Sequence, residues 1–260
     1  MAPCLLDLPP YETLDLEVHG RVLVVRLNRP LKHNAMTQTM FSELRQVLLQ
    51  AGGYPAVGAI VLTGRGPSFS AGADLNTFQT LNDAAAYRAQ LDLVEATFSA
   101  VEKCAVPVIA AVNGPALAGG LEILLFCDFV IASPDAVFGF SEVLVGLQPV
   151  YGLLRGPAVI GRNWTRYLAY TGENLDAQAA MSIGLVQRIV PLTSLVDEAL
   201  RTAGVIASRS PEAIREGKRL ANIHETDLIS AQRTAGRLFE SDTHKQAVEE
   251  FFRKRRRQGH

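Results

Sequence analysis

The spacing of apolar and polar residues in the first half of the chain predicts a series of short strands. Residues 13–18 alternate, with Leu14, Leu16 and Val18 on one face, and residues 21–27 are more continuously apolar. The His19-Gly20 pair between these two runs predicts a hairpin turn. Three further apolar runs are short enough for buried strands, and they cover residues 59–62, 108–112 and 129–132.

Apolar residues at helical spacing predict two long helices between these strands and a mainly helical second half. The first helix covers residues 37–50 and ends at Gly52-Gly53, and the second covers residues 81–103. After Gly152 only a short strand at 187–190 interrupts the helical pattern. The helices expected there cover residues 164–171, 176–183, 193–207, 211–222, 226–240 and 243–256. With no internal repeat and no linker, this order indicates an α/β core followed by a helical extension.

Composition excludes several classes of protein. The 260 residues carry a net charge of -1, with 48% hydrophobic and 20% charged residues, which argues against a nucleic-acid or membrane partner. The basic cluster 253–257 is read as a solvated helix end. The N-terminal residues lack a signal-peptide pattern, and no apolar run approaches the ~20 residues of a membrane span. The three cysteines form no spaced set, so a cytoplasmic location is expected.

The stretch 106–133 holds the first candidate for chemistry. A strand at 108–112 is followed by a turn of small residues and by an apolar segment, 121–127, that suits a core helix. Glu122 lies inside this apolar segment, where a carboxylate is rarely buried without a partner or a task. Gly119 precedes it by three residues, on the same helical face, and free N–H groups at a helix start can receive an oxyanion.

A second loop, residues 63–74, repeats the same design of strand, small residues and helix. Each loop alone is explained by the tight turns that glycine and alanine permit. Two such loops together with the buried Glu122 favour two backbone donors for one ligand oxygen.

A second carboxyl, Glu142, also lies among apolar residues, after Phe140-Ser141 and before Val143. A first-turn glutamate favoured by the helix dipole is a sufficient alternative explanation, and Ser141 is a candidate N-cap there. Asp74 and Asp128 are read as turn or cap residues.

Other chemistries lack their motifs. Gly119-Gly120-Leu121 stands where a Walker loop needs Gly-Lys-Ser/Thr, and neither a dinucleotide fingerprint nor a nucleophile elbow is present. The five histidines show no metal-ligand spacing, so no metal site is expected.

Four motifs in order along the chain are similar to those of the enoyl-CoA hydratase/isomerase (crotonase) superfamily. They are Asn28-Arg29-Pro30 with His33-Asn34-Ala35, Ser70 to Leu75, Asn113 to Glu122, and Phe138 to Glu142. The resemblance implies an α/β fold, a crotonase-like spiral of ββα turns over residues 1–195. It also implies a helical region, 196–260, for trimerisation and pocket covering. It implies homotrimers or dimers of trimers, and an acyl-CoA thioester as substrate, with coenzyme A as part of that substrate and no separate cofactor.

The resemblance also implies roles for individual residues. The N–H groups of Ala73 and Gly119 match the oxyanion hole, and Glu122 and Glu142 match the two glutamates of the hydratases. The residues that match the coenzyme A-binding segments are Lys32, Ala35, Ala71, Asp74 and Leu75.

The activity expected from this match is the reversible hydration of a 2-enoyl-CoA to a 3-hydroxyacyl-CoA. A double-bond isomerase, which needs only one carboxyl, and a non-catalytic acyl-CoA-binding homologue are the alternatives. One departure concerns the residues after Pro149, where hydratases carry a glycine-rich run and this chain has Val150-Tyr151. Bulkier side chains there are expected to narrow or reshape the pocket.

Overall fold

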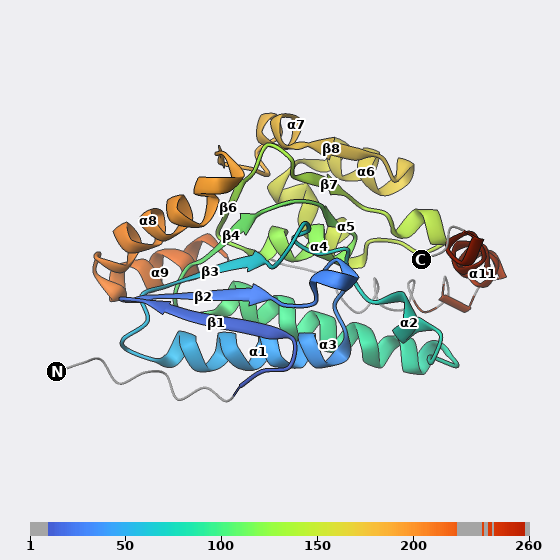
Figure 1. The fold of residues 1–260 in the computed structure, drawn as a ribbon, viewed down its shortest axis with the longest axis horizontal. Helices are drawn as coiled ribbons and strands as arrows, with labels where there is room; N and C mark the ends of the chain where they lie inside the picture. Colours follow the sequence, from blue (N-terminus) through green and yellow to red (C-terminus); the bar gives the residue numbers. More distant parts are fainter. Residues whose placement is uncertain (1–9, 223–235, 237–238, 241, 258–260) are drawn as a thin grey trace.

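The computed structural model describes residues 10–222, 236, 239–240 and 242–257 (Figure 1). The helix expected at 226–240 lies almost entirely outside these residues. Within the described part of the chain, no helix is long and apolar enough to cross a membrane.

A six-stranded sheet forms the centre of the molecule, in the order β1-β2-β3-β4-β6-β9. The β1–β2 hairpin is antiparallel and turns at Gly20, whose φ of 59° suits glycine. All the other neighbouring strands are parallel. The strands are β1 Leu14–His19, β2 Val22–Leu27, β3 Ala59–Gly64, β4 Val108–Val112, β6 Phe129–Ala132 and β9 Arg188–Ile189. The strands expected from the sequence are confirmed, and two of them match to the residue.

Helices cover both faces of this main sheet (Figure 1). Helices α1, Gln38–Gly53, and α3, Ala84–Lys103, pack side by side on one face, and α8, Leu195–Ala207, packs on the other. Helix α8 opens the region 196–260, and it contacts β2, β3 and β4 directly.

The start of α1 is capped as its sequence suggests, but its end differs from the expectation. The Thr37 side chain accepts a hydrogen bond from the Met40 amide. The helix does not stop at Gly52 but runs through Gly53. A Cβ at Gly52 would lie 2.9 Å from the Cys104 sulfur, so this glycine permits close packing inside the helix.

A small second sheet lies beside the main one and is absent from the sequence expectations. Its strands are β5 Ala116–Leu117, β7 Val137–Gly139 and β8 Asn174–Asp176. Two isolated bridges, Met36–Ala73 and Ser70–Ala116, attach the loop 70–74 to neighbouring segments. Strands of two or three residues are too short to show any periodicity, which is why the sequence did not reveal them.

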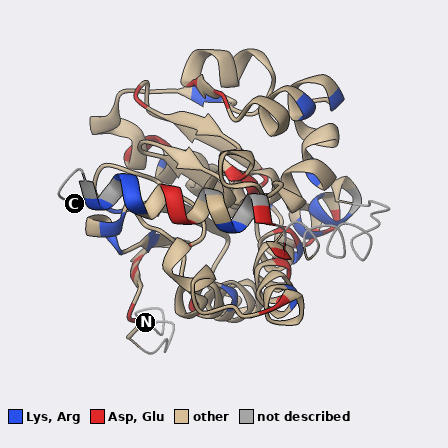
Figure 2. Cartoon of the chain, turned by 90° about the vertical axis from the view of Figure 1, so that its right-hand side faces the viewer, with Lys and Arg blue, Asp and Glu red and all other residues tan. Residues whose placement is uncertain are grey.

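The second half is helical, as expected, with one helix that the sequence analysis missed. The elements are α5 Val150–Val159, α6 Arg162–Thr171, α7 Ala177–Ser182, η4 Leu192–Ser194, α9 Pro211–Ala221 and α11 Asp242–Arg257. Helix α5 was missed because Pro157 and two glycines lie inside it. Along α11 and around it, basic and acidic residues are interspersed (Figure 2).

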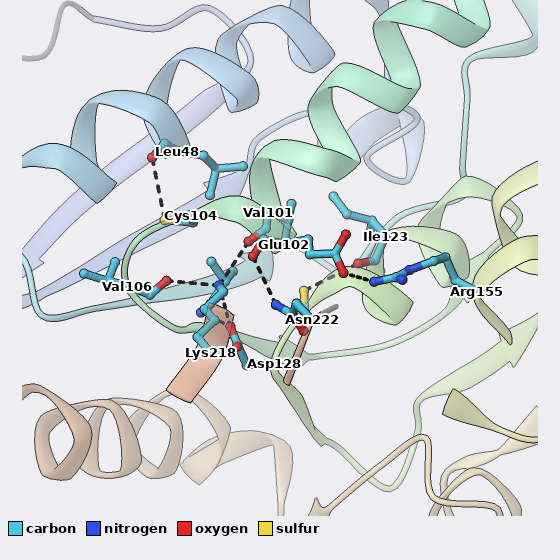
Figure 3. A network of polar contacts seen from close by, with 12 residues as sticks. Leu48, Val101, Glu102, Cys104, Val106, Ile123, Asp128, Arg155, Lys218 and Asn222 are labelled. Carbon is cyan, nitrogen blue, oxygen red and sulfur yellow. Dashed lines mark hydrogen bonds and ion pairs between the residues drawn. The ribbon is translucent and has the colours of Figure 1, made fainter. Parts of the chain in front are cut away.

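A buried polar network joins α9 to the core (Figure 3). The Lys218 ammonium lies 2.8 Å from the Asp128 carboxylate and donates to the carbonyls of Val101 and Val106 at 3.1 and 3.2 Å. Asp128 also accepts the Val108 amide at 2.7 Å, at the start of β4. A second pair, Glu102–Arg155, joins α3 to α5 beside it.

Candidate active site

The two loops of small residues meet at one place. A Cβ at Gly72 would lie 2.9 Å from the Gly119 nitrogen, and one at Gly119 would lie 3.6 Å from the Ala73 nitrogen. Any larger side chain at Gly72 would therefore separate the loops. The prediction that these amides lie close together agrees with this geometry.

Both amides are free to bind a ligand. The Met36 backbone amide donates to the Gly72 carbonyl at 2.8 Å, and the Met36 carbonyl accepts from the Asp74 amide at 2.9 Å. In this parallel pairing the amide of the intervening residue, Ala73, points away from Met36. Gly119 is the first residue of α4, Gly119–Glu122, and helix-start amides lack an intrahelical acceptor. Within the described residues, neither the Ala73 nor the Gly119 amide has an acceptor.

Ala118 fixes the direction of the second amide through a strained backbone. Its φ of 50° and ψ of −127° are unusual for a residue with a Cβ. Its amide donates to the Gly139 carbonyl at 2.9 Å, and its carbonyl accepts the amides of Leu121 and Glu122. These three bonds hold the strained conformation in place.

Glu122 lies at the end of α4, one turn from Gly119, and is buried. The apolar segment continues as the 3₁₀ turn η2, Ile123–Phe126, rather than as one helix over 121–127. One carboxylate oxygen of Glu122 accepts the amides of Tyr151 and Gly152, both at 2.9 Å. Burial raises the pKa of Glu122 to about 7, although these two hydrogen bonds oppose the rise.

Glu142 opens the 3₁₀ turn η3, Glu142–Val145, and its carboxyl has a different environment. Its Oε2 atom is buried and has no hydrogen-bond partner. Burial raises its pKa well above the usual range, and the negative charge of Glu122 raises the pKa further. Ser141 occupies the N-cap position, as expected, but its side chain makes no capping hydrogen bond.

The Tyr151 side chain, a bulky departure from the glycine-rich run of the hydratases, packs in the core. Its ring packs edge-on against Phe98 and near Phe126 in the core, and its hydroxyl donates to the Leu91 carbonyl at 2.5 Å. Core contacts therefore hold the side chain, and the Tyr151 backbone amide reaches the Glu122 carboxylate. Sequence analysis missed this amide and that of Gly152, although Pro149 before an apolar run is a signal for a helix start.

The residues expected to bind coenzyme A lie along two adjoining segments. The Ala71 amide donates to the His33 carbonyl at 2.9 Å, which pairs the segment after η1, Pro30–Lys32, with the loop before α2, Leu75–Phe78. The buried residue Asn34 holds these segments together, because its side-chain amide donates hydrogen bonds to the backbone carbonyls of Arg65 and Ser68. Lys32 and Ala71 are exposed, and Ala35 and Leu75 are half-buried.

Asp74 has a structural task in the same loop. Its side chain caps α2 by accepting the Asn76 amide at 3.0 Å and pairs with Arg29 at 3.0 Å. Burial alone would raise the pKa of Asp74, but the hydrogen bonds from Asn76 and Arg29 outweigh it and lower the pKa. This agrees with its interpretation as a cap.

Amides without an acceptor can stabilise negative charge on a ligand oxygen, and carboxyl groups with raised pKa values can transfer protons near neutral pH. No group of three or more potential metal ligands occurs among the described residues.

Comparison with known proteins identifies the family. The model of the enoyl-CoA hydratase/isomerase family matches residues 17–258, and the chain belongs to this family. It is 36% identical to the crotonyl-CoA hydratase of Syntrophomonas wolfei over 253 residues, covering 95% of this chain and 97% of the relative. It is 35% identical to the short-chain-enoyl-CoA hydratase of Clostridium acetobutylicum over 251 residues, covering 94% and 96%.

Solved structures agree with this result. A crystal structure of an enoyl-CoA hydratase/isomerase from Xanthobacter autotrophicus is 31% identical and superposes with a TM-score of 0.86, covering 94% of each chain. One from Pseudoalteromonas atlantica is 32% identical, with a TM-score of 0.82 over 94% of this chain and 98% of that one. The resemblance and the fold class expected from the sequence are confirmed.

Proposed function

We propose that this chain catalyses the reversible hydration of a 2-enoyl-CoA to a 3-hydroxyacyl-CoA. The observation that carries the proposal is the meeting of the Ala73 and Gly119 amides in a site with two glutamates, Glu122 and Glu142, whose pKa values are raised. Relatives named as enoyl-CoA hydratases, at 35–36% identity over most of the chain, support the assignment.

The two amides act on the thioester carbonyl. Addition of water to C3 moves electrons toward this oxygen and builds an enolate-like charge. Donors held in advance at that position stabilise the transition state, and removal of one such donor elsewhere costs about 3–4 kcal/mol. The strained Ala118 and the Met36 pairing hold both donors before substrate binds, so little reorganisation is needed.

The two glutamates divide the proton transfers. Glu122, fixed by the amides of Tyr151 and Gly152, orients water and takes its proton as the oxygen bonds to C3. Glu142 gives its own proton to C2. The raised pKa of each group suits its task, since a base near pH 7 and an acid that stays protonated are both available.

Loss of enoyl-thioester absorbance with crotonyl-CoA tests the proposal. We expect wild-type protein to consume crotonyl-CoA, and Glu122→Gln and Glu142→Gln each to lower kcat by about 10²–10⁴-fold, the usual range for general acid–base groups. The control is Glu216→Gln, an exposed glutamate on α9 that pairs with Arg219, which should leave the rate unchanged. Binding of crotonyl-CoA without any loss of absorbance would favour a non-catalytic acyl-CoA binder.

The proposals on assembly and cofactors rest on the family resemblance, and the proposal on location rests on the pattern of the three cysteines. We propose a homotrimer or a dimer of trimers, a cytoplasmic location, and a reaction that uses no metal or redox cofactor.

A further inference from the structure

A groove of about 910 Å³ lies between the α2–α3 connection and α11. We call it the α11 groove. Figure 1 places α11 at the end of the molecule nearest α2. Charged and polar residues form one part of its lining, and the apolar part consists of Phe78, Leu81, Phe239, Val248 and Phe252.

Tyr87 on α3 stands behind two of these apolar residues. Its ring stacks on Phe239 with centroids 4.4 Å apart and meets Phe78 edge-on at 6.0 Å. Tyr87 is only 4% exposed and does not itself line the groove. We call Phe78, Tyr87 and Phe239 the aromatic wall. One side of this wall faces the α11 groove.

Contacts of α3 connect the aromatic wall to Glu122. Tyr151, whose amide donates to Glu122, also donates through its hydroxyl to Leu91, one turn after Tyr87 on α3. Burial raises the pKa of Tyr87, and the negative charges of Glu122 and Glu142 raise it further.

We propose that the Tyr87 ring closes the acyl end of the site and restricts it to short 2-enoyl groups. This inference rests on the proposed function. Because C2 and C3 must lie at the glutamates, carbons from C4 onward extend past them. Tyr87 blocks that path, since two aromatic neighbours hold its ring and keep it from turning aside. Without the ring, the site and the α11 groove would form one continuous cavity.

The test is the dependence of kcat/KM on chain length, with 2-butenoyl-, 2-hexenoyl- and 2-decenoyl-CoA. We expect wild-type protein to prefer the shortest substrate. Tyr87→Ala should raise the ratio of decenoyl to butenoyl kcat/KM by about tenfold or more, since one methylene in an apolar pocket already changes kcat/KM by about 10–200-fold. Tyr87→Leu, which removes less apolar volume, repeats the test if the alanine variant does not fold.

Two controls separate the ring from its surroundings. Tyr87→Phe keeps the ring and removes the hydroxyl, so the chain-length ratio should stay at the wild-type value. Phe252→Ala widens the α11 groove behind an intact wall and should also leave the ratio unchanged.

Binding of butyryl-CoA and decanoyl-CoA, measured by calorimetry, gives a readout independent of turnover. If neither the wild-type protein nor any variant hydrates a substrate, the proposed function fails. The role of the Tyr87 ring is then tested by the affinities for butyryl-CoA and decanoyl-CoA alone. A selective gain in decanoyl-CoA affinity in Tyr87→Ala or Tyr87→Leu then supports it. A wild-type protein without chain-length preference, or variants that keep the wild-type ratio in both measurements, would overturn it. A Tyr87→Phe variant that behaves like Tyr87→Ala would also overturn it.

Discussion

At the scale of single residues, the two glutamates differ in what surrounds their carboxyls. Glu122 receives two backbone hydrogen bonds, whereas the buried Oε2 of Glu142 receives none. Hydrogen bonds favour the ionised form and burial disfavours it. The structure therefore favours an ionised Glu122 beside a protonated Glu142. The sequence identified Glu122 by its apolar neighbours, but its amide partners lie 29 and 30 residues away and follow only from the fold.

The pH profile of kcat/KM follows from these environments. Glu122 must be ionised to accept a proton, so activity should rise with pH through its pKa of about 7. Glu142 must be protonated, so activity should fall at higher pH, above its raised pKa. The pH profile of kcat/KM is therefore bell-shaped, and its two apparent pKa values belong to the coupled pair of glutamates. Initial rates with crotonyl-CoA between pH 5 and 10 measure it. A rate that does not rise between pH 5 and 7 would contradict this account, because a glutamate with the ordinary pKa of about 4.3 is already mostly ionised at pH 5.

At the scale of elements, the first turn of α5 determines where Glu122 lies. The helix begins directly after Pro149, and its amides at Tyr151 and Gly152 bind the carboxylate. A Cβ at Gly152 would lie 2.6 Å from two atoms of the Phe140 ring, so this position cannot accept a side chain without movement.

We therefore expect Gly152→Ala to displace the start of α5. Overpacking of this kind costs about 1–3 kcal/mol of stability, and a shift of about 1 Å near the reacting groups can cost 10²-fold in rate. Denaturant unfolding and kcat with crotonyl-CoA are the measurements. The matched control is Gly204→Ala in α8, where a Cβ meets nothing within 4 Å. That variant should keep its activity and its stability. If Gly152→Ala and Gly204→Ala had the same kcat and the same stability, the start of α5 would not position Glu122.

The elements also show where sequence patterns succeed. Strands β4 and β6 were predicted to the residue, because each is an apolar run bounded by residues that end a strand. Helix α5 was missed because Pro157 and its glycines oppose helix propensity, and tertiary packing overrides that preference. The loop geometry at Ala118 depends on contacts with Gly139, a distant residue, so no local pattern could reveal it.

At the scale of the whole molecule, the buried Lys218 ammonium fastens α9 to the active-site core. Lys218 comes from α9, whereas Asp128 stands between η2 and β6, six residues after Glu122. The ion pair thus joins α9 to the segment that follows Glu122 (Figure 3).

We expect Lys218→Met to lower the free energy of unfolding by about 1–3 kcal/mol, because it leaves the carbonyls of Val101 and Val106 without their buried donor. The double variant Lys218→Met/Asp128→Asn should recover part of this loss, since an asparagine oxygen can still accept the Val108 amide. Arg219→Met, which removes an exposed pair with Glu216, should change stability by less than about 1 kcal/mol. Urea unfolding of the three variants measures these changes in the free energy of unfolding. An unchanged stability in Lys218→Met would refute the anchoring role.

The most direct test of the central claim is a crystal structure of the Glu142→Gln variant with crotonyl-CoA bound. The account predicts that the thioester oxygen lies about 2.7–3.1 Å from both the Ala73 and the Gly119 nitrogens. It also predicts a water molecule bound to Glu122 and facing C3. A thioester oxygen out of reach of either amide would contradict the account.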